Sequence, residues 1–287
     1  MTIRFRSDTA VTRLSDSRWR AELAERWSSL VGIHGGYAVA IATRAIDEAV
    51  GDPAKPVRTL SAQFLRPLRP GPVEIGVTIE RRGQTLVFAS ARLHQEHRTA
   101  LLVRTTSAGT PGYESLAYDD HRRRPRPARP PVGLGRFAAP GLVRHFEQVD
   151  VRMDPDVTPF SGGGEARVAA WLRPLDDEPV DTAWLVAACD VLPPAAFSRT
   201  TGPVRAATLD YTVHLPVADP AARVPVGAHV YLDCRSPLAA DGLVVEDGEL
   251  WGPDGTVLAV SRQTRAADAR VPLSSAGPAA PATPAAS

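Results

Sequence analysis

The sequence predicts an α+β fold in which two consecutive domains each combine one long helix with a mostly antiparallel sheet. Three observations favour this fold class. The chain has 287 residues, enough for two compact domains of roughly 150 residues, each with its own core. Each half contains one apolar helical pattern followed by several strand-like runs. The two halves also resemble each other in sequence, which indicates an internal duplication.

The first helix is predicted at residues 36–50, where apolar residues recur at helical spacing and polar residues form a narrow strip. A helix of this composition is largely buried. Gly51 and Pro53 then provide its C-terminal stop. Residues 182–192 have the corresponding pattern in the second half, and the proline pair that follows ends it.

Alternating or β-branched runs follow each helix, and turn residues separate them. The predicted strands are residues 57–65, 73–82, 86–94 and 99–106 in the first half and residues 204–215, 228–235, 243–251 and 257–265 in the second, with short leading strands at 9–14 and 144–153. One buried helix wrapped by such a sheet, occurring twice, is typical of a double hotdog fold with two tandem hotdog domains.

The similarity between the halves is weak in identity but consistent in order. Residues 84–93 align without a gap with residues 241–250, and the same register places Thr106 opposite Gln263. The duplication therefore allows the polar residues of one half to be compared with those of the other.

Composition divides the chain further. The predicted domains are an N-terminal hotdog domain at 1–120, a basic proline-rich linker at 121–140, a C-terminal hotdog domain at 141–268 and a disordered tail at 269–287. The basic run in the linker lacks interleaved aromatic residues and a recognisable reading module, so we expect no nucleic-acid binding.

The overall charge and hydropathy exclude several classes of protein. The chain has 33 basic and 32 acidic residues, so its net charge of +1 creates no overall field for nucleic acid or an anionic membrane. No apolar run approaches the roughly 20 residues of a membrane-spanning helix, and the N-terminus lacks a signal peptide pattern. The two cysteines, Cys189 and Cys234, fit a reducing compartment. We expect a soluble, cytoplasmic protein with free thiols.

Asp190 is the most unusual polar residue of the second half, because Val186, Ala187 and Val191 surround it on the predicted helix. The pattern leaves two interpretations open. Either the carboxylate is partly desolvated, which is frequent for a general base, or it lies at the edge of the helix and faces water.

Thr208 and Gln263 lie on predicted strands. Sorting residues 204–215 by a period of two places Thr208, Asp210 and His214 on the face opposite Tyr211. This pattern fits an ordinary amphipathic strand as well as a polar cleft. Gln263 lies on the last strand, where a glutamine is usually solvated or bonded to the backbone.

Several short sequence segments, taken together and in order, resemble the bacterial acyl-CoA thioesterase II family, a double-hotdog group. CDVLP at 189–193, ATLD at 207–210 and GTVLAVSRQ at 255–263 are similar to its three active-site segments, and HGGY at 34–37 and FLRP at 64–67 are similar to its first hotdog. The resemblance covers about residues 27–264.

This resemblance implies an acyl-CoA thioesterase of lipid metabolism that acts on acyl-CoA without a metal or other cofactor and forms a homodimer or larger homo-oligomer. The family positions its hydrolytic water with an aspartate, a threonine and a glutamine, and these fall on Asp190, Thr208 and Gln263. A carboxylate can accept a proton from water, while a hydroxyl and an amide can orient it.

The N-terminus of the first helix is a candidate substrate-binding site, formed by His34, Gly35 and Gly36. Free backbone N–H groups at such a terminus can stabilise a developing oxyanion. Tight packing explains the two glycines equally well.

The first half lacks the set of three. Thr59 corresponds to Thr208, but Thr106 stands at the place of Gln263, and no aspartate occupies the matching face of the first helix before Asp47. We therefore predict that the N-terminal hotdog is degenerate and that each chain has one active centre.

Other chemistries have weaker support. The chain has no G-x-S-x-G elbow for a serine hydrolase. His94, Glu96 and His97 are possible metal ligands without a supporting pattern, so we expect no metal site. Two alternatives stay open: a hotdog hydratase or dehydratase using His214 and Asp210, and a degenerate double hotdog that binds acyl-CoA or is structural. Candidate contacts for the CoA phosphates are Arg66, Arg81, Arg82, Arg262 and Arg265.

Overall fold

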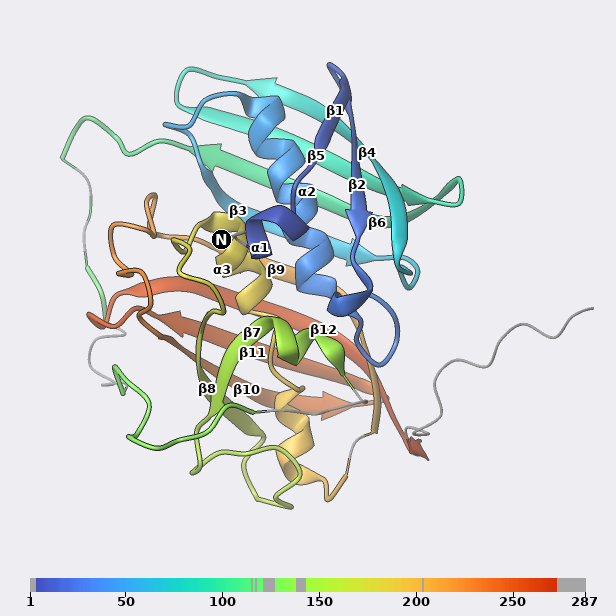
Figure 1. The fold of residues 1–287 in the computed structure, drawn as a ribbon, viewed down its shortest axis with the longest axis vertical. Helices are drawn as coiled ribbons and strands as arrows, with labels where there is room; N and C mark the ends of the chain where they lie inside the picture. Colours follow the sequence, from blue (N-terminus) through green and yellow to red (C-terminus); the bar gives the residue numbers. More distant parts are fainter. Residues whose placement is uncertain are drawn as a thin grey trace, which may run out of the picture.

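The computed structural model describes residues 4–114, 116, 118–120, 127–137, 143–202 and 204–272, and its strands form one continuous antiparallel sheet (Figure 1). The helices are α1 (Arg4–Asp8), α2 (Gly35–Val50) and α3 (Thr182–Ala188), with 3-10 turns at Glu25–Trp27, Arg144–Gln148 and Ala195–Arg199. The strands are β1 (Thr12–Ser15), β2 (Arg18–Leu23), β3 (Val57–Phe64), β4 (Gly71–Arg82), β5 (Leu86–Gln95), β6 (Arg98–Ala108), β7 (Val149–Met153), β8 (Arg167–Pro174), β9 (Val204–His214), β10 (Val230–Ala240), β11 (Leu243–Trp251) and β12 (Val257–Pro272).

The sheet has the order β1-β2-β4-β5-β6-β3-β9-β12-β11-β10-β8-β7. The strands β3 and β9 are neighbours at its centre, where Ala62 pairs with Tyr211. Read outward from this junction, the second half repeats the connectivity of the first, strand for strand. The predicted α+β class with a mostly antiparallel sheet is confirmed.

The helix α2 crosses the strands of the first half, as Figure 1 shows for the light blue coil. Its first residue is preceded by His34, whose side chain accepts a hydrogen bond from the Tyr37 N–H and caps the helix. At the other end, Gly51 adopts φ 63°, a left-handed conformation that suits glycine. Ile41 and Ile46 are fully buried, so the helix forms the centre of this core. The prediction for 36–50 is confirmed.

The second helix is much shorter than predicted. The pattern indicated residues 182–192, but α3 ends at Ala188, and the chain then turns tightly, with the Asp190 N–H bonded to the Ala187 carbonyl at 3.2 Å. Proline disfavours helical geometry in the residue before it, and Leu192 precedes Pro193. The expectation of one long helix in each domain is therefore wrong for the second half, and Asp190 lies in the turn that follows α3.

Two strands were not predicted. The strand β8 is buried on both faces and lacks the alternation that would reveal it, whereas β2 alternates regularly but is only six residues long. The predicted leading strand at 144–153 begins as the 3-10 turn Arg144–Gln148 and becomes β7 only afterwards.

Parts of the predicted linker and tail lie outside the described residues. Of the linker, residues 127–137 are described and contact the second half: the Trp171 indole N–H donates to the Pro127 carbonyl, and the Phe137 N–H donates to the Val151 carbonyl. Of the tail, β12 continues to Pro272, and residues 273–287 are not described. In the described part of the chain, no helix is long and apolar enough to cross a membrane.

Candidate active site

A cavity of about 380 Å³ lies where the N-terminus of α2, the turn after α3 and the strand β9 meet. Most of its wall is apolar and includes Phe64, Leu68, Val143, Phe146, Leu192 and Phe197. The polar groups that border it include Asp190, Thr208 and Arg265. A mostly apolar wall with a few convergent polar groups is typical of a site for a small molecule.

Asp190 is buried, with only 8% of its surface exposed. Its Oδ2 accepts a hydrogen bond of 2.8 Å from the Gly36 N–H, in the first turn of α2. His34 lies beside it, with Nε2 2.9 Å from the Asp190 carbonyl oxygen and 3.5 Å from Oδ2. Because His34 Nδ1 accepts from the Tyr37 N–H, its proton is on Nε2, which therefore donates. The interpretation that Asp190 faces water is wrong.

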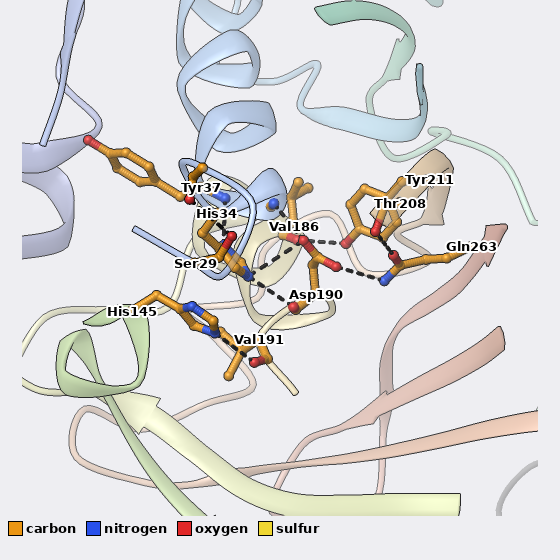
Figure 2. A network of polar contacts seen from close by, with 12 residues as sticks. Ser29, His34, Tyr37, His145, Val186, Asp190, Val191, Thr208, Tyr211 and Gln263 are labelled. Carbon is orange, nitrogen blue, oxygen red and sulfur yellow. Dashed lines mark hydrogen bonds and ion pairs between the residues drawn. The ribbon is translucent and has the colours of Figure 1, made fainter. Parts of the chain in front are cut away.

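Thr208 and Gln263 meet Asp190 from the sheet side. The Gln263 amide donates from Nε2 to Asp190 Oδ1 at 3.0 Å, and the Thr208 hydroxyl donates to Gln263 Oε1 at 3.1 Å. Figure 2 shows Asp190 between His34 and Gln263, with Thr208 next to Gln263. The structure thus brings the three residues together. Gln263 is only 2% exposed and does not border the cavity, so it reaches the site through the other two.

A β-bulge in β9 determines how Thr208 points. Asp210 pairs with Thr264 and Thr208 pairs with Arg265, so Leu209 is an extra residue in the ladder. Thr208 therefore faces inward together with Tyr211, whose hydroxyl donates to the Val186 carbonyl of α3 at 2.6 Å. The strict period of two placed Thr208 and Tyr211 on opposite faces, and this expectation is wrong.

His214 and Asp210 lie on the other face of β9. Neither borders the cavity, and His214 instead lines a separate polar hollow that includes Ser61, Glu80 and Arg104. The pair predicted for a hydratase or dehydratase is therefore not part of the cavity that Asp190 borders.

The sequence did not identify two residues as members of this site, Arg265 and Glu246. The Arg265 guanidinium, 7% exposed, donates from Nη2 to Glu246 Oε1 at 3.0 Å and to Asp190 Oδ1 at 3.3 Å, and from Nη1 to Thr208 at 2.8 Å. Burial opposes its charged form, but the carboxylates of Glu246 and Asp190 raise its pKa, so it is always charged. The sequence carried part of the signal, because residues 263 and 265 share a strand face, but the pairing of Glu246 with Gln263 appears only in the ladder.

The other candidate arginines have different surroundings. Arg66 borders the cavity and donates to the Thr99 carbonyl. Arg82 donates to the last carbonyls of α2, and Arg81 is exposed. Arg262 forms an exposed ion pair with Asp247. Of the five, Arg265 is wrong as a surface contact for phosphate, because it is buried and paired.

The three residues at the N-terminus of α2, 34–36, have different roles. Gly35 and His34 border the cavity, whereas Gly36 does not. A Cβ at Gly36 would lie 2.8 Å from the Cβ of Asp190, so only glycine lets α2 and the turn after α3 approach so closely. Gly36 therefore serves packing and the hydrogen bond to Asp190.

His145 is a further cavity residue that the sequence did not indicate. Its ring lies 4.4 Å from that of His34, and its Nε2 is 3.1 Å from the Val191 carbonyl oxygen. Burial, and then the nearby His34, lower the pKa of His145 well below its ordinary value. Both wall histidines thus bind main-chain carbonyls around Asp190.

The strand pairing also corrects the alignment of the two halves. The alignment that matches Thr59 with Thr208 also matches Ala62 with Tyr211, and the partners of these two residues on the next strands are Val103 and Gln263. The gapless alignment had placed Thr106 there. The position of Gln263 in the first half is therefore apolar.

His94, Glu96 and His97 were the possible metal ligands in the sequence, and no metal site was expected there. These residues line a small surface hollow at the end of β5. Across the part of the chain that the structure describes, no group of three or more histidine, cysteine, aspartate or glutamate side chains is arranged to hold a metal ion.

Comparison with known proteins gives consistent matches. Family models described as the acyl-CoA thioesterase N-terminal domain and C-terminal domain match residues 23–108 and 118–266. An uncharacterized protein of Mycobacterium tuberculosis is 28% identical over 205 residues, covering 63% of this chain and 69% of its own length.

Solved structures match more than nine tenths of the chain. A conserved protein of unknown function with a hotdog fold from Alicyclobacillus acidocaldarius is 22% identical with a TM-score of 0.82, covering 94% of this chain and all of its own. A candidate thioesterase II from Thermobifida fusca is 25% identical, with a TM-score of 0.76 and coverage of 93% and 98%. An acyl-CoA thioesterase II from Mycobacterium marinum is 20% identical, with a TM-score of 0.71 and coverage of 92% and 98%. The fold is therefore a hotdog fold.

Proposed function

Because this chain belongs to the acyl-CoA thioesterase family, we propose that it hydrolyses the thioester of an acyl-CoA to a free fatty acid and CoA. The observation that carries the proposal is the chain of hydrogen bonds from Thr208 through Gln263 to a buried Asp190 at the wall of an apolar cavity. An acyl chain is apolar and its thioester is polar. The cavity offers both environments side by side.

In this mechanism Asp190 is the general base. It takes a proton from a water molecule, whose oxygen attacks the thioester carbonyl, and the resulting tetrahedral intermediate expels the CoA thiolate. The proton then returns to the thiolate or to solvent, so one water is consumed for each acid and thiol formed. The Thr208 hydroxyl borders the cavity and can hold the water, while Gln263 fixes Thr208 and Asp190 from behind.

The oxyanion of the intermediate fits at the N-terminus of α2. Gly35 borders the cavity, and a Cβ built on it would lie 3.1 Å from Asp190 Oδ2, so its backbone is adjacent to the proposed base. The sixteen-residue helix directs the positive end of its dipole there. His34 and Gly35 are thus the proposed substrate contacts, and Gly36 supports Asp190.

A second candidate is binding without turnover. Asp190 Oδ1 already accepts from both Gln263 and Arg265, and a carboxylate so fully engaged also suits a site that only recognises acyl-CoA. The two functions differ in a single measurement, the release of free CoA.

The wider assignments of the chain rest on the same family membership. We interpret the repeated strand order as two tandem hotdog domains, of which the second carries the catalytic set. A cytoplasmic location, a role in lipid metabolism and a homodimer or larger assembly remain predictions, and light scattering on the purified chain would measure the assembly.

The test is the release of CoA thiol from a panel of acyl-CoAs of increasing chain length. Asp190→Asn removes the proposed base and is expected to lower kcat by about 10²- to 10⁴-fold, with little change in binding. Asp210→Asn is the matched control, because Asp210 lies two residues from Thr208 but on the outer face. Saturable binding without any turnover by the wild type would contradict the proposed thioesterase activity and favour the proposal that the protein only binds acyl-CoA.

A further inference from the structure

We propose that Arg265 is a positioning residue for the hydrolysis, which holds Asp190 and Thr208 in their reactive orientation while Glu246 anchors it. This inference rests on the proposed function and adds two residues to its machinery. Arg265 is buried at the cavity wall, and its guanidinium contacts three side chains of the site at once.

The contacts close a ring of hydrogen bonds. Arg265 donates to the Thr208 hydroxyl, Thr208 donates to Gln263 Oε1, and Gln263 Nε2 donates to Asp190 Oδ1. The second arm of Arg265 returns to the same Oδ1 at 3.3 Å. Since the guanidinium has only donors, the Thr208 proton must point to Gln263, and the amide orientation of Gln263 follows. Arg265 therefore sets the direction of every bond in the ring.

The ring also distinguishes the two oxygens of Asp190. Oδ1 accepts from two donors, Gln263 and Arg265, which occupy its lone pairs. Oδ2 accepts one short bond from the Gly36 N–H and lies 3.5 Å from His34. The geometry points to Oδ2 as the atom that receives the proton from water, on the side of the carboxylate next to Gly35.

Glu246 keeps the guanidinium in place. Its Oε1 accepts from Arg265, and its Oε2 accepts from the Ala195 N–H in the 3-10 turn after α3, so the carboxylate is fixed from two sides. With Asp190 ionised, the three buried groups have a net charge of −1, and the N-terminus of α2 faces this charge. A planar fork with fixed donors suits this task better than a flexible ammonium.

The competing explanation is structural: Arg265 neutralises two buried carboxylates and does nothing for the reaction. Removing one partner of a buried ion pair destabilises a fold, so a single neutral substitution cannot separate the two explanations. The double variant Arg265→Gln, Glu246→Gln removes both charges and keeps a polar side chain at each position. Its folding is checked by thermal unfolding, and its binding by the KM for the preferred acyl-CoA.

We expect the double variant to keep KM within about twofold and to lose about 100-fold in kcat, the loss typical of a small misplacement of reacting groups. Arg265→Lys keeps the charge but not the fork, and we expect a kcat between those of the double variant and the wild type. The control is Arg13→Gln, Asp16→Asn, which removes an exposed ion pair that does not border the cavity and should leave kcat unchanged.

Each outcome decides one point. A folded double variant with the kcat of the wild type would overturn the positioning role and leave Arg265 as a neutralising group. If the double variant does not fold, Arg265→Lys decides: a wild-type kcat would overturn the role, and a lowered kcat with unchanged KM supports it. A wild type that releases no CoA from any substrate contradicts the proposed function itself, together with this role.

Discussion

Asp190 accepts hydrogen bonds from donors in both halves of the chain. The Gly36 N–H and His34 approach from the first half of the chain, and Gln263 and Arg265 approach from β12. A buried ionised carboxylate is stable only when hydrogen bonds and opposite charge compensate the lost water. The surroundings of Asp190 meet this condition and still leave one oxygen beside the cavity.

Replacing Thr208 by valine tests the hydroxyl in this arrangement. The substitution keeps the shape of the side chain but removes the bond to Gln263 and the acceptor for Arg265. We expect kcat to fall by about 10- to 100-fold, and stability to fall by about 1–3 kcal/mol because a buried donor of Arg265 and a buried acceptor of Gln263 each lose a partner. Thr212→Val, on the outer face of β9, is the control and should retain activity. Equal effects of both variants would contradict the assignment.

Cys189 precedes Asp190 and raises the question of a thiol nucleophile. Burial raises the pKa of the Cys189 thiol to about 12, although Tyr211 works in the opposite direction, so the thiol is protonated at neutral pH. Burial also raises the pKa of Cys234 well above its ordinary value. We expect neither thiol to react with an aromatic disulfide reagent in the native protein, and both to react after unfolding in guanidinium. Rapid reaction of the native protein would disprove this.

At the level of elements, the site depends on how closely α2 approaches the turn after α3. The contact is made by Gly36, whose backbone N–H bonds Asp190. The bulge at Leu209 provides the other half of the geometry, because it turns Thr208 toward the same point. Neither element supplies the site alone.

Gly36→Ala tests the approach of the two elements. A Cβ there would lie 2.8 Å from Asp190 Cβ and 2.9 Å from the Ala187 carbonyl oxygen. We expect a loss of about 1–3 kcal/mol in the free energy of unfolding, and a lower kcat because Asp190 is displaced. Gly76→Ala in β4 is the control, since nothing lies within 4 Å of the added Cβ. Chemical denaturation and CoA release measure the two effects, and a wild-type kcat for Gly36→Ala would argue against this role.

Asp47 makes the stability of α2 depend on pH. Burial raises the pKa of this carboxyl to about 7, while Arg44 lowers it and Asp181 raises it further. The folded state therefore binds the proton more tightly than the unfolded chain, and this stabilisation is lost as pH rises from about 4 to about 7. Asp47→Asn cannot lose a proton. We expect it to exceed the wild type in stability by about 1–2 kcal/mol at pH 8 and to lose this advantage toward pH 4. A difference independent of pH would contradict the assignment.

The elements also show what could be predicted from the sequence. Long periodic patterns such as α2 were found, because their burial and their glycine cap are local features. The bulge at Leu209 was not found, because it appears only when β9 pairs with β12. Arg265 was predicted only as a candidate contact for the CoA phosphates for a similar reason: its burial depends on Glu246, which is distant in sequence but adjacent in the ladder. Asp190, Thr208 and Gln263 came from family resemblance, since their own patterns left other interpretations open.

At the level of the whole molecule, the proposed active centre is assembled from both halves. The first half contributes the N-terminus of α2, and the second contributes Asp190, Thr208 and Gln263. The equivalent place in the first half is apolar: Val103 stands where Gln263 does, and its partner Ala91 stands where Glu246 does. Both Val103 and Ala91 are buried in the core. At this place in the fold, the second half therefore has polar side chains and the first half has apolar ones.

This asymmetry predicts one site per chain. A thioether analogue of acyl-CoA cannot be hydrolysed, so calorimetric titration should give one equivalent bound per chain, and Asp190→Asn should retain that stoichiometry because the cavity wall is largely apolar. Val103→Gln should not create a second site, since Ala91 offers neither the carboxylate of Glu246 nor an anchor for an arginine. Two equivalents per chain would mean that the first half binds substrate on its own, and the view of a degenerate N-terminal half would then be wrong.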